Sequence, residues 1–402
     1  MQKENSFQVP RIILISAFLL AFAIAVSQHC VPPMEHIIRA EFHITHTQTG
    51  FIFTIPIIMT AALSIPAGIL TDRLGIRKAA GLGLILMVIG AVLRGMTTDY
   101  FELVAFTFIL GVGSACILPN LAKLVSLWVP REKAGIATGI YAIGISVGGG
   151  IAIAITLPLV YPVTSTSQGA FLIWSIPIII ATVVWWLFIK DPPYLDRFDE
   201  TIKQDGISFL QIIKTKVLWL VAISLFLRNF FYFNWVAWAP ALMMEKGAPE
   251  NMAAVIASLI LWFTIPGFLL APWLSNKIGL RKPFVWLPSI ILALASLWAI
   301  YIDVPMSWLL MILVGIMDGT KYVMLLALPI EIMPKETVGR ASGLIISIGF
   351  TGGIIGPLIG GYTLDFTGNL NLSLLILLGL SILAIGIALK LPETGPRTSL
   401  KR

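Results

Sequence analysis

The sequence is poor in charged residues. Lys, Arg, Asp and Glu together make up 12% of the 402 residues, whereas soluble domains carry about 25%. Hydrophobic residues make up 58%, and the mean hydropathy is +0.94. A surface in contact with water needs far more charge than this. The composition therefore excludes the two or three soluble domains that the length alone would suggest.

Cysteine and histidine are also scarce. Cys30 and Cys116 lie in or at the edge of apolar segments, and the four histidines show no metal-ligand spacing. We interpret both cysteines as packing residues. The sequence has no nucleotide-binding glycine loop and no nucleophile–base arrangement. We therefore expect no cofactor, no ATP hydrolysis and no enzymatic activity.

The apolar residues occur in long runs, each close to the roughly 20 residues that a helix needs to cross a bilayer. Such runs must be helical, because lipid offers no water to unpaired backbone groups. The first run lacks a small-residue cleavage site, so we expect no cleaved signal peptide. The expected spans are 11–31, 48–70, 79–98, 101–123, 133–156, 168–189, 215–238, 252–274, 283–302, 306–329, 337–361 and 369–390.

The positions of the basic residues predict the orientation of these spans. The 27 basic residues lie at the termini and in alternate loops, with five exceptions. The exceptions are Arg39, Lys246, Arg94, Arg228 and Lys321. The basic side is expected to be cytoplasmic, with both termini on it, in the cell membrane. The net charge of +7 is then a topology signal, and nucleic acid is not expected as a partner.

The two halves of the chain repeat at a constant offset. Pro130-Arg131-Glu132-Lys133 matches Pro334-Lys335-Glu336-Thr337, and the same offset of 204 relates Gly75 to Gly279 and Gly148 to Gly352. A tandem duplication of a six-helix unit implies a pseudo-twofold axis along the membrane normal. We expect an all-α membrane protein of twelve helices, with bundles at 1–189 and 215–402 around a cytoplasmic loop at 190–214. A monomer is expected, since each chain would enclose its own pathway.

The loop between the second and third spans carries a known pattern. The stretch Gly68-Ile69-Leu70-Thr71-Asp72-Arg73-Leu74-Gly75-Ile76-Arg77-Lys78 resembles the signature loop of the major facilitator superfamily. With twelve spans and a degenerate second copy at 272–282, the resemblance covers essentially the whole chain. It implies transport of a small solute by alternating access, and it says little about the substrate.

The resemblance also implies a cytoplasmic latch, a contact that holds the two halves together in one state and releases them in the other. The second copy has Asn276 where Asp72 would be, so a weaker latch is expected there. The alternative is a short turn with positive-inside charges. The latch residues implied are Gly68, Asp72, Arg73, Gly75, Arg77, Lys78 and Arg340.

A finer resemblance rests on the stretch from Trp235 through Pro240, Gly247, Ser258 and Pro266-Gly267 to Arg281-Lys282-Pro283. It is similar to the cyanate and nitroimidazole permease branch, or to the anion:cation symporter branch. Gly352, Gly356-Pro357 and Gly360-Gly361 resemble a pattern that exchangers carry on their fifth span. Here the pattern is on the eleventh span, so we interpret it as close helix packing.

Three charges lie near the middle of predicted spans, where a charge costs about 2.5–3.5 kcal/mol on insertion scales. They are Arg228, Asp318 and Lys321. Asp318 and Lys321 are three residues apart and could pair, leaving Arg228 uncompensated. Alternatively, Arg228 could pair with Asp318 across two helices and leave Lys321. Either pairing leaves one positive charge, which suits an anionic solute, and a purely structural triad is the third possibility.

Other polar and aromatic residues complete the predicted site. Tyr232 and Trp235 follow Arg228 by four and seven residues and are expected on its helix face, and Asn120 is the candidate from the first half. Arg94, near an outer end, could reach the headgroups by snorkelling, and a binding role is the alternative.

Two functions follow as hypotheses. The first is a proton-coupled carrier of a small organic or inorganic anion, with Arg228, Lys321, Tyr232, Trp235 and Asn120 binding it and Asp318 carrying the proton. The second is a proton-driven exporter of lipophilic or cationic compounds, with Asp318 as the binding residue.

Overall fold

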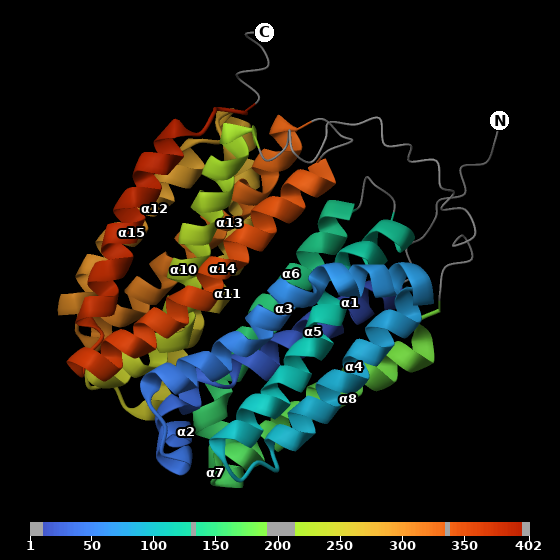
Figure 1. The fold of residues 1–402 in the computed structure, drawn as a ribbon. Coiled ribbons are helices and arrows are strands. Elements are labelled where there is room, and N and C mark those ends of the chain that lie inside the picture. Colours follow the sequence, from blue (N-terminus) through green and yellow to red (C-terminus); the bar gives the residue numbers. More distant parts are fainter. Residues whose placement is uncertain (1–10, 130–133, 191–213, 334–337, 396–402) are drawn as a thin grey trace. The chain divides into compact units, whose positions relative to one another are not determined.

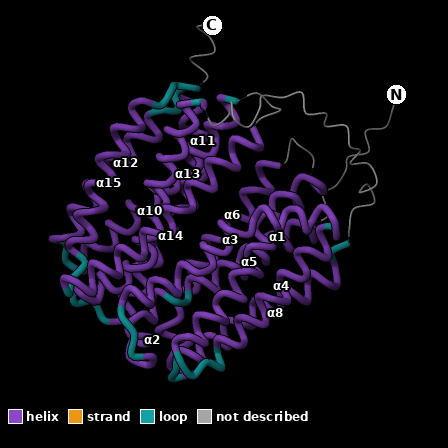
Figure 2. Tube along the Cα trace, in the orientation of Figure 1, coloured by secondary structure: helices purple, strands orange, loops and turns teal. Residues whose placement is uncertain are grey.

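Helices make up almost all of the protein, as the long apolar runs predict. The computed structural model describes residues 11–129, 134–190, 214–333 and 338–395. These residues form helices joined by short loops, and no strand occurs among them (Figures 1 and 2). Twelve of the helices are long and apolar enough to cross a membrane. The predicted all-α, twelve-span membrane fold is confirmed.

The helices of the first half are α1 (Arg11–His29), α2 (Glu35–Phe42), α3 (His46–Leu74), α4 (Ile76–Arg94), α5 (Tyr100–Trp128), α6 (Ala134–Ile155), α7 (Tyr161–Thr164) and α8 (Ser167–Phe188). A 3-10 turn, η1 (Pro32–Met34), joins α1 to α2, and a π-helical segment, η3 (Thr156–Val160), joins α6 to α7. The helices of the second half are α10 (Lys216–Glu245), α11 (Glu250–Ile278), α12 (Pro283–Tyr301), α13 (Val304–Ile332), α14 (Val338–Thr367) and α15 (Asn371–Lys390).

Several helices extend beyond the apolar runs that predicted them. Helix α3 covers His46–Leu74 where 48–70 was expected, and α10 continues to Glu245 where the run ends at 238. At about 1.5 Å per residue, helices of this length exceed a hydrocarbon core of about 30 Å. The extra turns satisfy their own backbone hydrogen bonds and carry polar side chains, which hydropathy does not detect.

Contacts divide the chain into two compact units. The first holds Met1–Cys30, Ile58–Ala152 and Val160–Ile202, and the second holds Val31–Ile57, Ile153–Leu159 and Lys203–Arg402. The second unit therefore includes α2 and the first 12 of the 29 residues of α3, together with α10 to α15. This assignment brings polar residues of α3 next to α14.

Equivalent positions of the two sequence repeats share some structural features. Gly75 and Gly279, one offset apart, both have positive φ values, 81° and 80°, in the turns after α3 and α11, although their ψ values differ, at 158° and 17°. This left-handed region suits glycine, which has no Cβ to clash. A Cβ on Gly148 would meet the carbonyl of Phe22, and one on Gly352 would meet the carbonyl of Phe226. The repeat in the sequence is therefore also a repeat of turns and helix contacts.

Close helix packing explains the glycines of α14. A Cβ on Gly356 would lie against the backbone of Phe230, and one on Gly361 would lie 2.8 Å from both the carbonyl oxygen of His46 and the Cα of Thr47. Small residues let helices approach in lipid, where apolar burial between helices gives little driving force. The interpretation of this glycine pattern as a packing surface is confirmed.

Candidate functional site

Helices α10 and α13 place three charged side chains inside the second unit. Arg228, Asp318 and Lys321 are 5%, 0% and 3% exposed. Arg228 Nη2 donates to Asp318 Oδ2 across the two helices. The second of the two pairings considered from the sequence is therefore the one that forms. The pairing of Asp318 with Lys321 within one helix is absent from the ion pairs of the described residues.

Two tyrosines enclose the guanidinium of Arg228. Its central carbon lies 4.4 Å from the ring centroid of Tyr232 and 4.2 Å from that of Tyr322. Such cation–π contacts are worth about 0.5–2 kcal/mol each, more when desolvated. Tyr232 thus lies where its spacing from Arg228 predicted. Tyr322 was missed, although it follows Asp318 by the same four residues, so the spacing that found Tyr232 could have found it.

A third helix also fixes Arg228. Its Nη1 donates to Asn229 Oδ1 at 2.9 Å, and Asn229 Nδ2 donates to the carbonyl of Gly349 in α14 at 3.0 Å. Sequence reasoning missed Asn229, because an amide next to a charge has no distinctive spacing. Arg228 is consequently held by α10, α13 and α14 together.

The cluster retains open hydrogen-bonding groups and an excess of positive charge. Arg228 Nε and Asp318 Oδ1 have no hydrogen-bond partner among the described residues. With all three groups ionised, the ion pair is neutral and the ammonium of Lys321 adds one positive charge. A buried charge without a counter-charge costs several kcal/mol. An anion bound at Lys321 would relieve that cost and could also accept the free N–H of Arg228.

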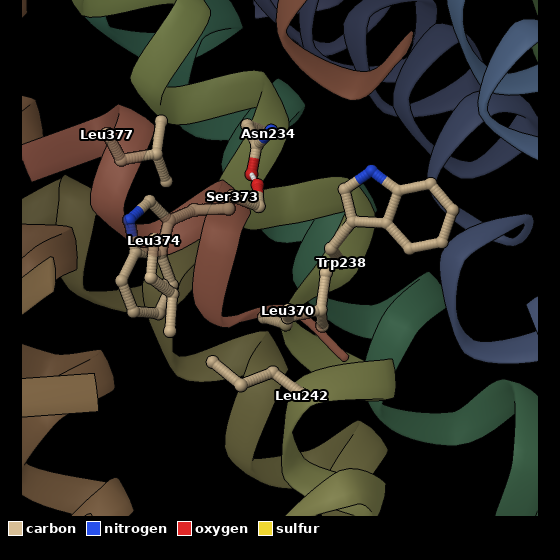
Figure 3. Close-up of a pocket in the computed structure, with 9 residues that line it drawn as sticks. Asn234, Trp238, Leu242, Leu370, Ser373, Leu374 and Leu377 are labelled. Carbon is tan, nitrogen blue, oxygen red and sulfur yellow. Dashed lines mark hydrogen bonds between the residues drawn. The ribbon is translucent and has the colours of Figure 1, made fainter. Parts of the chain in front are cut away.

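Trp235 takes a different direction from Tyr232. It packs against Phe231, with ring centroids 5.9 Å apart, and lines a small void between α10 and α15. Figure 3 shows Asn234, Trp238 and Ser373 at this void. Asn234 Nδ2 donates to the carbonyl of Gly356 at 2.7 Å. The structure thus brings Tyr232 to the charged cluster and places Trp235 against α15.

Asn120 lies in the first unit, on α5. Its Nδ2 donates to the carbonyl of Cys116 at 2.6 Å, one turn back on the same helix, and its side chain is buried. The amide group of Asn120 is therefore hydrogen-bonded to a backbone carbonyl of its own helix, a common arrangement for short polar side chains inside helices.

The residues of the predicted latch form contacts within the first unit. Asp72 accepts from Lys123 Nζ of α5 at 2.5 Å, and Asp72 is largely exposed. Arg77 Nη2 donates to the carbonyl of Trp186 at 2.9 Å. Arg73 and Lys78 are exposed, Gly75 forms the turn, and a Cβ on Gly68 would meet open space. Arg340 lies in the first turn of α14, and its side chain is outside the described part, so the latch stays a prediction.

A group of polar contacts joins the start of α3 to the end of α14. Asp365 accepts from the backbone N–H groups of His46 and Thr47, both at 2.8 Å, and from Thr47 Oγ1 at 2.6 Å. His46 Nδ1 lies 2.7 Å from Glu35 Oε1, which also pairs with Arg39 at 3.0 Å. Sequence reasoning did not predict this contact, because its partners are more than 300 residues apart.

Among the described residues, no group of three or more His, Cys, Asp or Glu could hold a metal ion. The chemistry available in the charged cluster is that of one carboxylate, two cations and aromatic rings.

Comparison with known proteins places this fold and site in context. The chain matches the family model described as Major Facilitator Superfamily over residues 13–357 and 230–402. It is 28% identical over 398 residues to an uncharacterised transporter of Bacillus subtilis, with 96% of this chain and 94% of the relative covered. A probable sulfoacetate transporter of Cupriavidus necator is 26% identical over 380 residues, with 87% and 86% covered.

The finer resemblance also has a counterpart. The 2-nitroimidazole transporter of Escherichia coli is 22% identical over 383 residues, covering 94% of each chain. Among solved structures, a bacterial homologue of the human lysosomal transporter Spinster, inward-facing and unoccupied, has a TM-score of 0.77 at 16% identity and covers 97% of both chains. At this identity the structural likeness shows the fold alone.

Proposed function

This chain belongs to the major facilitator superfamily, and from that premise we propose that it carries a small organic or inorganic anion by proton-coupled alternating access. The proposed setting is the cell membrane, with both termini cytoplasmic and one chain as the transporting unit. The basic loops on one side support this orientation. The named relatives are transporters, which supports a transport role without catalysis.

The observation that carries the anion proposal is the charge of the buried cluster. Arg228 and Asp318 neutralise each other, while Lys321 has no ion-pair partner among the described residues. A bound anion would supply the negative counter-charge that no described side chain supplies to Lys321 through an ion pair. The free N–H of Arg228 Nε would add a charge-assisted hydrogen bond, which is stronger than a neutral one.

Proton coupling follows from the same three charges. Protonation of Asp318 would raise the charge of the cluster by one while Arg228 and Lys321 stay cationic. Anion affinity would then increase, and by thermodynamic reciprocity a bound anion would favour the proton. Asp318 would carry the proton, with Arg228 and Lys321 holding the anion between Tyr232 and Tyr322.

The relative that is named a probable sulfoacetate transporter is consistent with this reading, since a sulfonate and a carboxylate are both matched by a guanidinium and an ammonium. Asn120 and Trp235 remain candidates for substrate contact elsewhere along the pathway. The latch residues, from Gly68 to Lys78 with Arg340, would hold one conformation of the cycle.

One observation favours a different substrate. Asp318 Oδ1 has no hydrogen-bond partner among the described residues, so it could accept from a cationic or lipophilic amine in a proton-driven exporter. Two cations beside that carboxylate oppose a cationic ligand by Coulomb repulsion. The anion proposal is therefore the better supported of the two.

The test is the thermal stability of the purified protein against panels of small anions and organic cations. A ligand at about 100 times its Kd stabilises the folded state by about 2.7 kcal/mol. One class of anion should raise the melting temperature, and Lys321→Gln should abolish the shift. Lys246→Gln is the matched control, because the ammonium of Lys246 donates to the carbonyl of Ile300, away from the charged cluster. Stabilisation by cations alone, lost in Asp318→Asn, would replace the anion proposal with export.

A further inference from the structure

A third buried cation lies in the first unit, far along the sequence from the charged cluster. Arg94 is the last residue of α4 and is 2% exposed. The expectation that it snorkels to the headgroups is wrong, because neighbouring helices enclose it. Its Nη1 donates to the carbonyl of Ser27 at 2.9 Å, and its guanidinium carbon lies 4.1 Å from the ring centroid of Phe171.

These contacts leave the charge of Arg94 without an acidic partner. Nε and Nη2 have no hydrogen-bond partner among the described residues, although the thiol of Cys30 lies close enough to interact with the guanidinium. Arg94 is absent from the ion pairs of the described chain. A carbonyl and an aromatic face are dipolar partners that do not cancel a full charge. A buried charge left without a counter-charge is strongly destabilising, by about 3–5 kcal/mol where one partner of a buried pair has been removed.

Beside the guanidinium is a cavity of about 10 Å³, enclosed by α1, α4, α5 and α8. It is lined by Ser27, Cys30, Ala91, Arg94, Leu110, Phe171, Trp174 and Ile178. Such a volume holds about one water-sized particle. The space is small for an organic anion, and the variants described below separate this cavity from the site of the transported solute proposed above.

The polar side chains of the lining do not supply a negative charge. Ser27 Oγ donates to the carbonyl of Ile24 at 2.7 Å, and Cys30 Sγ donates to the carbonyl of Ser27 at 3.5 Å. Cys30 therefore acts as a neutral thiol in this arrangement. Among the other lining residues, Trp174 has an indole N–H, which is a donor without negative charge, and Ala91, Leu110, Phe171 and Ile178 are apolar. A water molecule would satisfy one or both free N–H groups of Arg94 but would leave the positive charge uncompensated.

We propose that Arg94 binds a single monoatomic anion of halide size, with chloride as the physiological occupant, in the cavity between α1, α4, α5 and α8. The two free guanidinium nitrogens would donate to the ion, and the ring of Phe171 would cover the opposite face of the guanidinium. The bound ion would compensate the charge that ties the end of α4 to α1. It would therefore stabilise the first unit.

The experiment uses the full-length purified protein, exchanged into gluconate and titrated with chloride or bromide at constant ionic strength. The apparent melting temperature should rise with halide and then saturate, because a ligand that binds only the folded state stabilises it by mass action. Gluconate, too large for the cavity, should have no effect. Arg94→Gln removes the charge and should abolish the halide response.

Two further variants make the result decisive. Arg39→Gln removes an arginine that pairs with Glu35 and should retain the full halide response. Cys30→Ala tests the alternative that a Cys30 thiolate neutralises Arg94. If it does, removing the thiolate should enlarge the halide-induced rise in melting temperature. The proposal predicts little change. If Arg94→Gln does not fold, bromide anomalous diffraction of the unmodified protein replaces it. A bromide peak beside Arg94 Nε and Nη2 supports the proposal, and a halide-independent melting temperature or a site without bromide overturns it.

This result is separable from the transport proposal. Lys321→Gln should lose the response to the transported anion and keep the halide response, and Arg94→Gln should show the reverse. Loss of both responses in either variant would contradict two independent sites.

Discussion

Asp365 of α14 joins helices from the two sequence repeats, and its removal should release them. Its carboxylate accepts three hydrogen bonds from the first two residues of α3, His46 and Thr47. It therefore caps the amino terminus of a helix that belongs to the other repeat. These contacts lie on the side opposite the basic loops, so a carrier that opens there must break them.

The size of the effect follows from capping energies. A lost N-cap costs about 0.5–2 kcal/mol, and the interaction of a carboxylate with the positive end of a helix adds about 0.3–1 kcal/mol. Asp365→Ala should thus disfavour the joined state by about 1–3 kcal/mol, a shift of about 5-fold to more than 100-fold in population since each 1.4 kcal/mol is tenfold. Asp365→Asn keeps one acceptor oxygen, so it should lose the charge term and the hydrogen bonds made by the other oxygen, and it should disfavour the joined state less than Asp365→Ala does.

The assay is the labelling rate of a cysteine at position 49 by a polar maleimide. Thr49 lies in the joined region and is 2% exposed, so Thr49→Cys should react only when α3 and α14 separate. Cys30 and Cys116 would first be replaced by serine. Labelling should accelerate strongly in Asp365→Ala and weakly in Asp365→Asn.

The control is another capping aspartate. Asp303 accepts from the N–H of Met306 at the start of its own helix, α13, so Asp303→Ala removes a cap without separating two helices. It should lower the melting temperature and leave labelling at position 49 unchanged. If Asp365→Ala lowers the melting temperature but labels at the unmodified rate, the contact is structural and the reasoning is refuted.

Three further outcomes are expected. Lys321→Arg should retain anion binding and Lys321→Met should lose it, measured as ligand-induced change in melting temperature; equal binding in both variants would contradict an electrostatic role. Gly352→Ala should destabilise the protein by about 1–3 kcal/mol through overpacking against the backbone of α10. Gly343→Ala on the same helix is the control: its added Cβ would meet nothing within 4 Å, so it should be neutral or slightly stabilising. Equal melting temperatures of the two variants would contradict the packing argument. Asp72→Asn should change the free energy of unfolding by less than about 1 kcal/mol, because the ion pair of Asp72 with Lys123 is exposed. Under the latch proposal the same variant should slow transport in reconstituted vesicles. An unchanged transport rate would favour the alternative, a short turn with positive-inside charges.

The sequence by itself determined the class of the molecule. Twelve apolar runs predicted twelve helices, because backbone groups in lipid must be bonded within each helix. The constant offset between the two repeats predicted matching turns, and Gly75 and Gly279 both have a positive φ. This feature can be predicted from the local sequence, because it depends on a single residue without a Cβ. The neighbourhood of Tyr232 and Arg228 was predictable for the same reason, since residues four apart share a helix face.

Only the tertiary structure decided which distant side chains meet. Asp318 could have paired with Lys321 on its own helix, yet it pairs with Arg228 of α10, and Asp365 meets a helix end more than 300 residues away. Arg94 was expected at the surface and is enclosed by neighbouring helices. Spacing along one helix specifies its faces, but the partner of each face depends on how helices pack side by side. That packing, to which glycines such as Gly352 and Gly356 contribute, determines where a buried charge lacks a counter-charge.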